Sequence, residues 1–114
     1  MIQKHADVTV VVINESRLLE SRELDALAAE LYQLVDKMDR KKLIVDFTKV
    51  QFLASAAIGV VTALHQKSQA IKGTLVLCGF RKEIHKIFEI TRLTKLLKIC
   101  PSEKEAFALF GVTP

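Results

Sequence analysis

The stretch LIVDFTKVQFLASAAIGVV, residues 43–61, decides the fold because it joins a buried strand to a helix. Residues 43–47 are nearly all apolar, which is typical of a strand covered on both faces. Residues 48–53 form a connection, and helical spacing of apolar residues predicts a helix over roughly 55–71 that ends at Lys72-Gly73. The predicted apolar face of this helix consists of Ile58, Val61, Leu64, Ser68 and Ile71. Such a unit is the building block of α/β folds.

The alternation of strand and helix continues on both sides of this stretch. β-Branched residues predict a strand over 8–13, with a weaker strand before it around Ile2. Apolar spacings of three and four predict a helix over 21–38, with Ser21 as its N-cap and Met38 in its apolar stripe. The later elements predicted are a strand over 74–78, a helix over 82–90 with Ile84, Ile87, Phe88 and Ile90 as core residues, a short strand over 96–100, and a terminal helix carrying Ala106, Leu109 and Phe110.

A capping box is predicted at the start of the terminal helix. There the Ser102 hydroxyl would accept a hydrogen bond from the amide of Glu105, and the Glu105 side chain would reach back to Ser102. With this helix the element order is β, α, β, α, β, α, β, α. The sequence therefore predicts an α/β fold, a four-to-five-stranded mixed sheet covered by about four helices.

The composition predicts a single domain over residues 1–114. Half of the residues are hydrophobic and 26% are charged, which is enough apolar material for a core without metals or disulfides. Cys78 and Cys100 lie in apolar runs and are expected to be free thiols. No apolar run approaches the roughly 18 residues of a membrane span, and no signal-peptide pattern follows Met1. We therefore expect a cytoplasmic protein with no membrane span.

The common catalytic patterns are missing from the sequence. It has no glycine-rich phosphate loop, no Cys-x-x-Cys pair and no Gly-x-Ser-x-Gly turn. His5, His65 and His85 are scattered, without the spacing of metal ligands, and an ordinary surface role is expected for each. Asp46 is a lone carboxylate at a strand end. We therefore predict that the protein is not an enzyme and has no metal and no cofactor.

Ser55 stands at the start of the central helix, after the connection. The first turn of a helix has unpaired amides and the positive end of the macrodipole, which would partly neutralise a phosphoryl group there. The small neighbours Ala54, Ala56, Ala57 and Gly59 leave the serine accessible to another protein. The residues alone also allow a simpler role, in which Ser55 only caps the helix.

Residues 52–59, Phe-Leu-Ala-Ser-Ala-Ala-Ile-Gly, resemble the signature of STAS domains in anti-sigma factor antagonists. The resemblance extends over the whole chain. The first long helix, the strand over 74–78, the pattern Phe88-x-x-Thr91-x-Leu93-x-x-x-Leu97 and the helix opened by Ser102 fall where that family places them.

The resemblance implies a phosphorylation switch at Ser55. In that family the matching serine is phosphorylated by a partner that is both a serine kinase and an anti-sigma factor. The unphosphorylated domain binds this partner and frees the sigma factor, and a PP2C-type phosphatase restores binding after phosphorylation. By resemblance, the residues that bind the partner are Glu20, Ser21, Leu53, Ala54, Ser55, Ala56 and Ala57, with Glu20 near Ser55.

The chain departs from the family pattern at three positions. Ala54 replaces the aspartate before the serine, Ala57 stands where a glycine is usual, and the acid at the start of the first helix is Glu20. Loss of the aspartate removes a negative charge close to the hydroxyl. It leaves open a constitutive interaction module that regulates a non-sigma partner such as a signalling enzyme, a stressosome-like assembly or a lipid-transport complex.

Two further functions are less favoured by the sequence. Binding of nucleic acid would use Arg81, Lys82, Lys86, Arg92, Lys95 and Lys98, but Glu83 and Glu89 interrupt this basic patch and aromatic residues for stacking are scarce. An enzyme would need Cys78 or Asp46 in a pocket, and no spacing suggests a substrate. We therefore expect a protein-binding module without nucleic acid as a ligand; its oligomeric state stays open.

Overall fold

The computed structural model describes residues 2–5, 7–18 and 22–111. In chain order, its elements are β1 (Ile2–His5), β2 (Val8–Val12), β3 (Arg17–Leu18), α1 (Arg22–Asp36), β4 (Lys42–Asp46), β5 (Phe52–Leu53), α2 (Ser55–Ala70), β6 (Thr74–Cys78), α3 (Lys82–Ile90), the 3₁₀ turn η1 (Leu93–Lys95), β7 (Lys98–Cys100) and α4 (Glu103–Leu109).

The central sheet is five-stranded and mixed, with the order β1-β2-β4-β6-β7. The first pair, β1 and β2, is antiparallel, and every later pair is parallel. The register places Val10 beside Ile44 and Ile44 beside Val76, so the buried strand of the opening stretch lies at the centre of the sheet. The predicted fold class, a four-to-five-stranded mixed sheet with about four helices, is confirmed.

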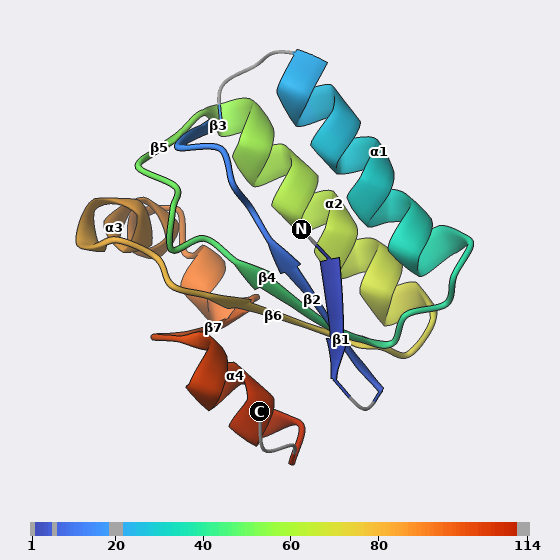
Figure 1. Ribbon diagram of the computed structural model, residues 1–114. Helices are drawn as coiled ribbons and strands as arrows, with labels where there is room; N and C mark the ends of the chain where they lie inside the picture. The colour runs from blue at the N-terminus through green and yellow to red at the C-terminus, as the bar shows by residue number, and fades with distance from the viewer. Residues whose placement is uncertain (1, 6, 19–21, 112–114) are drawn as a thin grey trace.

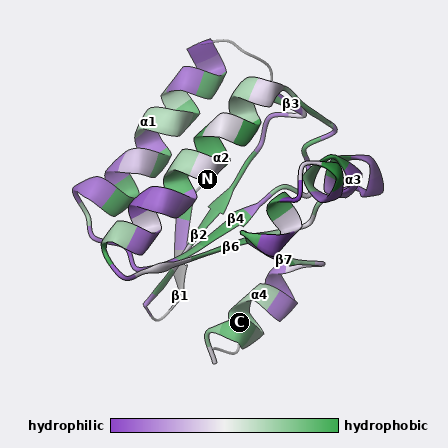
Figure 2. Ribbon diagram, turned by 180° about the vertical axis from the view of Figure 1, so that it is seen from behind, coloured by the Kyte–Doolittle hydropathy of each residue, from purple (hydrophilic) through white to green (hydrophobic). Residues whose placement is uncertain are grey.

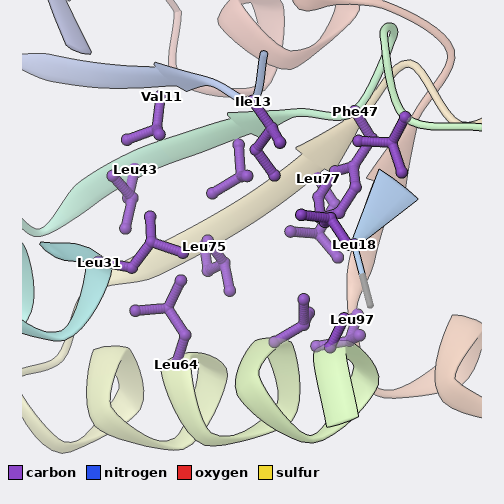
Figure 3. Close-up of a cluster of buried hydrophobic side chains, with 14 of the residues drawn as sticks. Val11, Ile13, Leu18, Leu31, Leu43, Phe47, Leu64, Leu75, Leu77 and Leu97 are labelled. Carbon is purple, nitrogen blue, oxygen red and sulfur yellow. The ribbon is translucent and has the colours of Figure 1, made fainter. Parts of the chain in front are cut away.

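Helices cover both faces of this sheet (Figure 1). On one face, α1 and α2 lie side by side, and Leu31, Leu43, Leu64 and Leu75 meet between helices and sheet (Figure 3). On the other face α4 covers a smaller cluster that includes Phe107. In Figure 2 the polar faces of α1 and α3 point outward while the strands are largely apolar. Each inner strand therefore alternates between two cores, as its nearly continuous apolar sequence predicts.

Three apolar residues that the sequence assigns to the core are exposed instead. Met38 is 52% exposed, Ile90 74% and Leu109 57%. Met38 lies two residues beyond Asp36, the last residue of α1. Ile90 lies six residues after the buried Ile84. This spacing places Ile90 roughly 240° around the helix axis from Ile84, away from the packed face. Leu109 is similarly rotated away from the face of α4 that Ala106 and Phe107 bury.

Two predicted helix ends differ in detail. The left-handed residue after α2 is Lys72, with φ 59°, and not Gly73. Gly73 is needed for close approach, because a Cβ there would lie 2.8 Å from the carbonyl oxygen of Lys41. At α4, Ser102 is the N-cap, but its hydroxyl donates to the Glu105 carboxylate and makes no cap bond to an amide. The Glu105 carboxylate therefore reaches back to Ser102 as predicted, whereas the predicted bond from the Glu105 amide to the Ser102 hydroxyl is wrong.

Candidate functional site

A second, two-stranded sheet holds the connection before Ser55, where the sequence predicts no strand. Strand β3 pairs in parallel with β5, with Arg17 opposite Phe52 and Leu18 opposite Leu53. The amide of Ala54 donates to the carbonyl oxygen of Leu18 at 2.8 Å. This pairing fixes the chain just before α2 and brings residues 17 and 18 beside the start of that helix (Figure 1).

Ser55 is the first residue of α2 and is exposed. The N-cap position belongs to Ala54, which has extended backbone angles (φ −81°, ψ 160°) and makes no side-chain cap bond. The alternative that Ser55 merely caps the helix is therefore wrong. The first helical bonds are donated by the amides of Ala57 and Ile58 to the carbonyl oxygen of Ala54, at 3.0 and 3.3 Å. The amides of Ser55 and Ala56 precede them, at the positive end of the helix.

The other residues predicted to bind a partner differ in exposure. Leu53, Ala54 and Ala56 are partly buried beside Ser55. Ala57 is 1% exposed, so its methyl group belongs to the core and not to the surface. Glu20 and Ser21 lie outside the described residues, and the predicted approach of Glu20 to Ser55 stays a prediction.

A groove with a volume of about 510 Å³ adjoins the segment that leads into Ser55. It lies between β3, β5 and α3, and is lined by Arg17, Gln51, Phe52, Leu53, Arg81, Glu83, Ile84 and Ile87. Phe52 is 55% exposed, and the Arg17 guanidinium lies 5.1 Å from the centre of its ring, within cation–π distance. Sequence reasoning missed this groove because its walls come from three separate segments.

The two arginines of the groove are available to an anionic partner. Neither Arg17 nor Arg81 forms an ion pair with a carboxylate in the part of the chain that the structure describes. The first turn of α2 contains no acidic residue either. The surface around Ser55 therefore combines exposed apolar area with unpaired positive charge, apart from Glu83 in the groove wall.

A second polar cluster lies at the carboxyl end of β4. Asp46 is 7% exposed. Its Oδ1 accepts hydrogen bonds from the amide of Thr48 at 2.8 Å and from the Thr48 hydroxyl at 2.5 Å. Gly79, with φ 78°, is required beside it, because a Cβ there would lie 2.3 Å from Thr48 Oγ1. This packing ties the end of β4 to the end of β6.

Glu103, the first residue of α4, shares a hydrogen bond with Asp46. Burial by itself raises the pKa of Asp46, but bonds from Glu103 and Thr48 and the charge of Lys49 together hold it below its usual value. The bond to Asp46, partial burial and the Asp46 charge raise the pKa of Glu103 to about 7. A protonated Glu103 can therefore donate to the Asp46 carboxylate, which links α4 to the sheet below about pH 7.

Among the described residues, the thiols are not activated and the potential metal ligands are not grouped. Burial, followed by the negative charges of Asp46 and Glu103, raises the pKa of the Cys78 thiol far above its usual value, which makes it a poor nucleophile. Cys78 and Cys100 are free thiols, as predicted. Among the described residues no three His, Cys, Asp or Glu side chains are placed to hold a metal ion. His65 is 8% exposed, which corrects its predicted surface position.

Comparisons with known proteins agree with the fold and with the family resemblance of the chain. The family model of the STAS domain matches residues 1–106. BtrV of Bordetella bronchiseptica, named as a candidate anti-sigma factor antagonist, is 28% identical over 93 residues, which are 82% of this chain and 79% of that protein. None of the described helices is long and apolar enough to cross a membrane.

Solved structures share the fold at low sequence identity. An anti-sigma factor antagonist (STAS) domain protein from Planctomyces limnophilus superposes with a TM-score of 0.84 at 19% identity, covering 96% of this chain and 94% of that one. SpoIIAA, solved in its unphosphorylated form, superposes with a TM-score of 0.75 at 16% identity, covering 98% of each chain. Its phosphorylated form, from Bacillus, gives a TM-score of 0.74 at 14% identity, covering 96% of this chain and 97% of that one.

Proposed function

The chain belongs to the STAS domain family, and we propose that it acts as an anti-sigma factor antagonist whose partner binding is switched by phosphorylation of Ser55. Anti-sigma factor antagonists are regulatory proteins and not enzymes, and in our proposal the partner of this chain is an anti-sigma factor. In our proposal residues 1–114 act as one cytoplasmic domain. Its unphosphorylated form binds an anti-sigma factor that is also a serine kinase, and a PP2C-type phosphatase reverses the modification.

The exposure of Ser55 and its position in the helix are the main support for this proposal. It is exposed at the first position of α2, and Ala54 occupies the N-cap. The Ser55 hydroxyl does not cap the helix. A kinase can therefore modify it without breaking a bond that stabilises α2. The adjacent amides and the helix dipole would partly neutralise the added phosphate, so the helix would persist after modification.

Phosphorylation would act on the complex and not on the fold. A phosphate adds about −1.5 to −2 charges, and burying it against a partner surface without a matching cation costs several kcal/mol. SpoIIAA, a protein of the same fold, has been solved in phosphorylated and unphosphorylated forms. The same fold in both forms supports a switch that works through the binding surface.

We further propose that the docking surface extends from Ser55 into the groove beside it. The exposed Phe52 and the partly exposed Leu53 and Ile87 offer apolar area to bury. Arg17 and Arg81 favour carboxylates on the partner. The anti-sigma factor would therefore present an apolar side chain flanked by acidic residues. Leu53, Ala54 and Ala56 would complete the contact beside Ser55. By resemblance, Glu20 and Ser21 would also belong to this surface.

A phosphorylation assay with matched variants tests this function. The chain is incubated with ATP and each serine kinase of the histidine-kinase-like type encoded in the same genome, and phosphopeptides are identified by mass spectrometry. We expect phosphate on Ser55 and none on a Ser55→Ala variant. Ser55→Asp should weaken binding to the unmodified partner on the order of 100-fold, about 3 kcal/mol.

The control for Ser55→Asp is Gln66→Glu, which adds the same charge to an exposed position about three turns further along α2. It should bind the partner as tightly as the wild type. Both variants should unfold at nearly the wild-type temperature. Ser55→Asp binding as tightly as Gln66→Glu, or phosphate found only on another serine, would contradict the proposed switch.

A constitutive binding module is the second candidate, and Ala54 favours it. Without an acidic group beside the hydroxyl, a kinase that depends on this charge would not recognise Ser55. In that case the same surface would bind a partner in all growth conditions. Persistent absence of phosphate on Ser55 in native cells, during growth and under stress, would select this candidate.

A further inference from the structure

One edge of strand β5 has no neighbouring strand and lies beside the groove near Ser55. Strand β5 pairs with β3 on its other side. The segment that contains β5 lines the groove with Gln51, Phe52 and Leu53, whereas β3 contributes Arg17. The opposite wall is the start of α3. In Figure 1, β5 runs on the side of β3 that is nearer to α3. The edge of β5 that β3 does not cover therefore faces the groove.

The backbone bonds between the two short strands show which groups of β5 are already used. The amide of Phe52 donates to the carbonyl oxygen of Ser16 at 3.1 Å, and the amide of Ala54 donates to that of Leu18 at 2.8 Å. Both amides therefore point toward β3. Successive amides of an extended strand point to opposite sides, so the amide between these two belongs to the uncovered edge.

Three backbone groups consequently point away from β3. They are the amide of Leu53 and the carbonyl oxygens of Gln51 and Leu53, because the carbonyl of a planar trans peptide lies opposite its amide hydrogen. Among the described residues, no hydrogen bond joins any of these three groups to an element other than β3. The amide and carbonyl of Leu53 are the pair that one residue of an added antiparallel strand would bond.

The side chains around this edge fit a segment that combines acidic and apolar residues. Arg17 and Arg81 form no ion pair in the described part of the chain, and Glu83 is the acid of the lining, so the groove has a net positive charge. Phe52 is 55% exposed, and Ile87 is partly exposed in the opposite wall. Side chains of an extended segment alternate between two sides, so one set would meet the arginines and the other the apolar walls.

We propose that an extended acidic segment of the partner adds to the uncovered edge of β5 as a third strand, within the groove. The proposal rests on the docking surface described above and specifies the conformation of what binds there. Main-chain bonds to Leu53 contribute affinity, and the alternating side chains contribute specificity. A helix in the same groove would bury the amide and carbonyl of Leu53 without bonding them, which is unfavourable.

Nuclear magnetic resonance titration of the full chain with a short peptide tests this edge without any kinase. The probe is acetyl-Asp-Val-Asp-Val-Asp-Val-amide, added at constant ionic strength. We expect saturable shifts in the groove and an exchange rate of the Leu53 amide with solvent that falls at least about 10-fold. The amides of Phe52 and Ala54 are the internal controls, since each already donates to a carbonyl next to β3 or within it and should keep its exchange rate.

Two N-methylated versions of the peptide test the main-chain bonds. One carries the methyl groups on its three valine amides and the other on its three aspartate amides, so the two have the same charge and composition. Only one edge of an added strand faces β5, so one version should bind at least about 10-fold more weakly than the other. Equal binding of the two versions would overturn the proposal, as would an unchanged exchange rate of the Leu53 amide.

Matched variants test the charge of the groove. Arg17→Gln and Arg81→Gln should each weaken the peptide about 5-fold, whereas Lys86→Gln removes an exposed charge of α3 outside the lining and should change nothing. Absence of saturable shifts, or groove shifts that depend on the concentration of the chain alone, would contradict the proposal; the latter would mean that a second copy covers the edge.

The two proposals fail separately. Phosphate on Ser55 without peptide binding would remove the added strand and leave the switch. Peptide binding without phosphate on Ser55 would remove the switch and leave the added strand.

Discussion

The N-termini of α2 and α4 begin in similar ways but carry opposite electrostatics. Each follows an extended N-cap residue, Ala54 in one helix and Ser102 in the other, and neither N-cap bonds an amide through its side chain. The first turn of α4 contains Glu103 and Glu105, whereas the first turn of α2 has no acid. One helix therefore provides its own negative charge, and the other leaves its positive end unneutralised beside an exposed serine.

This difference suits the two helix starts to different roles: the start of α4 is a structural contact, and the start of α2 is a binding surface. The start of α4 is tied to the sheet through Glu103 and Asp46, and its next turn buries Ala106 and Phe107. The start of α2 is held by the backbone pairing of β3 and β5 and by the buried Ala57, which leaves Ser55 free. Changes near the start of α4 should therefore affect stability, and a change at Ser55 should affect binding.

The largest effect on stability is expected from Phe107→Ala. This side chain is 1% exposed and fills the core beneath α4, so its loss should lower the free energy of unfolding by about 3–5 kcal/mol. Leu109→Ala, on the exposed side of the same helix, should cost less than about 0.5 kcal/mol. Chemical denaturation measures both. Equal losses would mean that α4 is not anchored through Phe107.

The pH dependence of stability tests the interaction between the Glu103 and Asp46 side chains. The pKa of Glu103 rises from an ordinary value of 4.5 to about 7 in the folded chain, so the folded state holds more protons in this window. Its contribution to stability is therefore complete below pH 4.5 and is lost as the pH rises through about 7. The free energy of unfolding lost over this pH range should be on the order of 1 kcal/mol. It is small because solvent screens the partly exposed Glu103.

Glu103→Gln should remove this decline, because the amide can donate to Asp46 at every pH. The variant should then be more stable than the wild type at pH 8. Glu105→Gln, an exposed acid in the same turn, should leave the decline unchanged. Unfolding curves between pH 4.5 and 8 provide the measurement. A decline that persists in Glu103→Gln would assign it to another group.

Ala54→Asp should make the start of α2 resemble that of α4. The extended backbone of residue 54 suits an N-cap, so an aspartate there should stabilise the protein by about 1 kcal/mol. It also restores the family's acid next to Ser55. We expect a higher unfolding temperature and faster phosphorylation of Ser55 by the kinase. A lower unfolding temperature would show that this turn cannot accept a cap.

The smallest effect is expected from Ser102→Ala. A serine N-cap normally contributes about 1 kcal/mol, but here its hydroxyl bonds the exposed Glu105 carboxylate and not an amide. The loss should therefore be only a few tenths of a kcal/mol by chemical denaturation. A loss near 1 kcal/mol would indicate that the hydroxyl caps an amide in solution.

Much of the fold and the position of Ser55 could be predicted from the sequence. The buried strand over residues 43–47 and the helices on either side were visible because burial on two faces and helical spacing each leave a local pattern. The exposed Met38, Ile90 and Leu109 were assigned wrongly because an apolar residue near a helix end fits the same local pattern. The spacing of apolar residues along the chain does not show which of them contact the core.

The sequence by itself determined the order of elements, the central βα unit and the serine at its helix start. Only the tertiary structure decided what surrounds them. The pairing of β3 with β5 involves two residues from each strand, too few for a periodic signal. Asp46 and Glu103 meet although 57 residues apart, and His65 is buried by distant segments. Such contacts depend on how whole elements pack, and that information is absent from any single stretch of the chain.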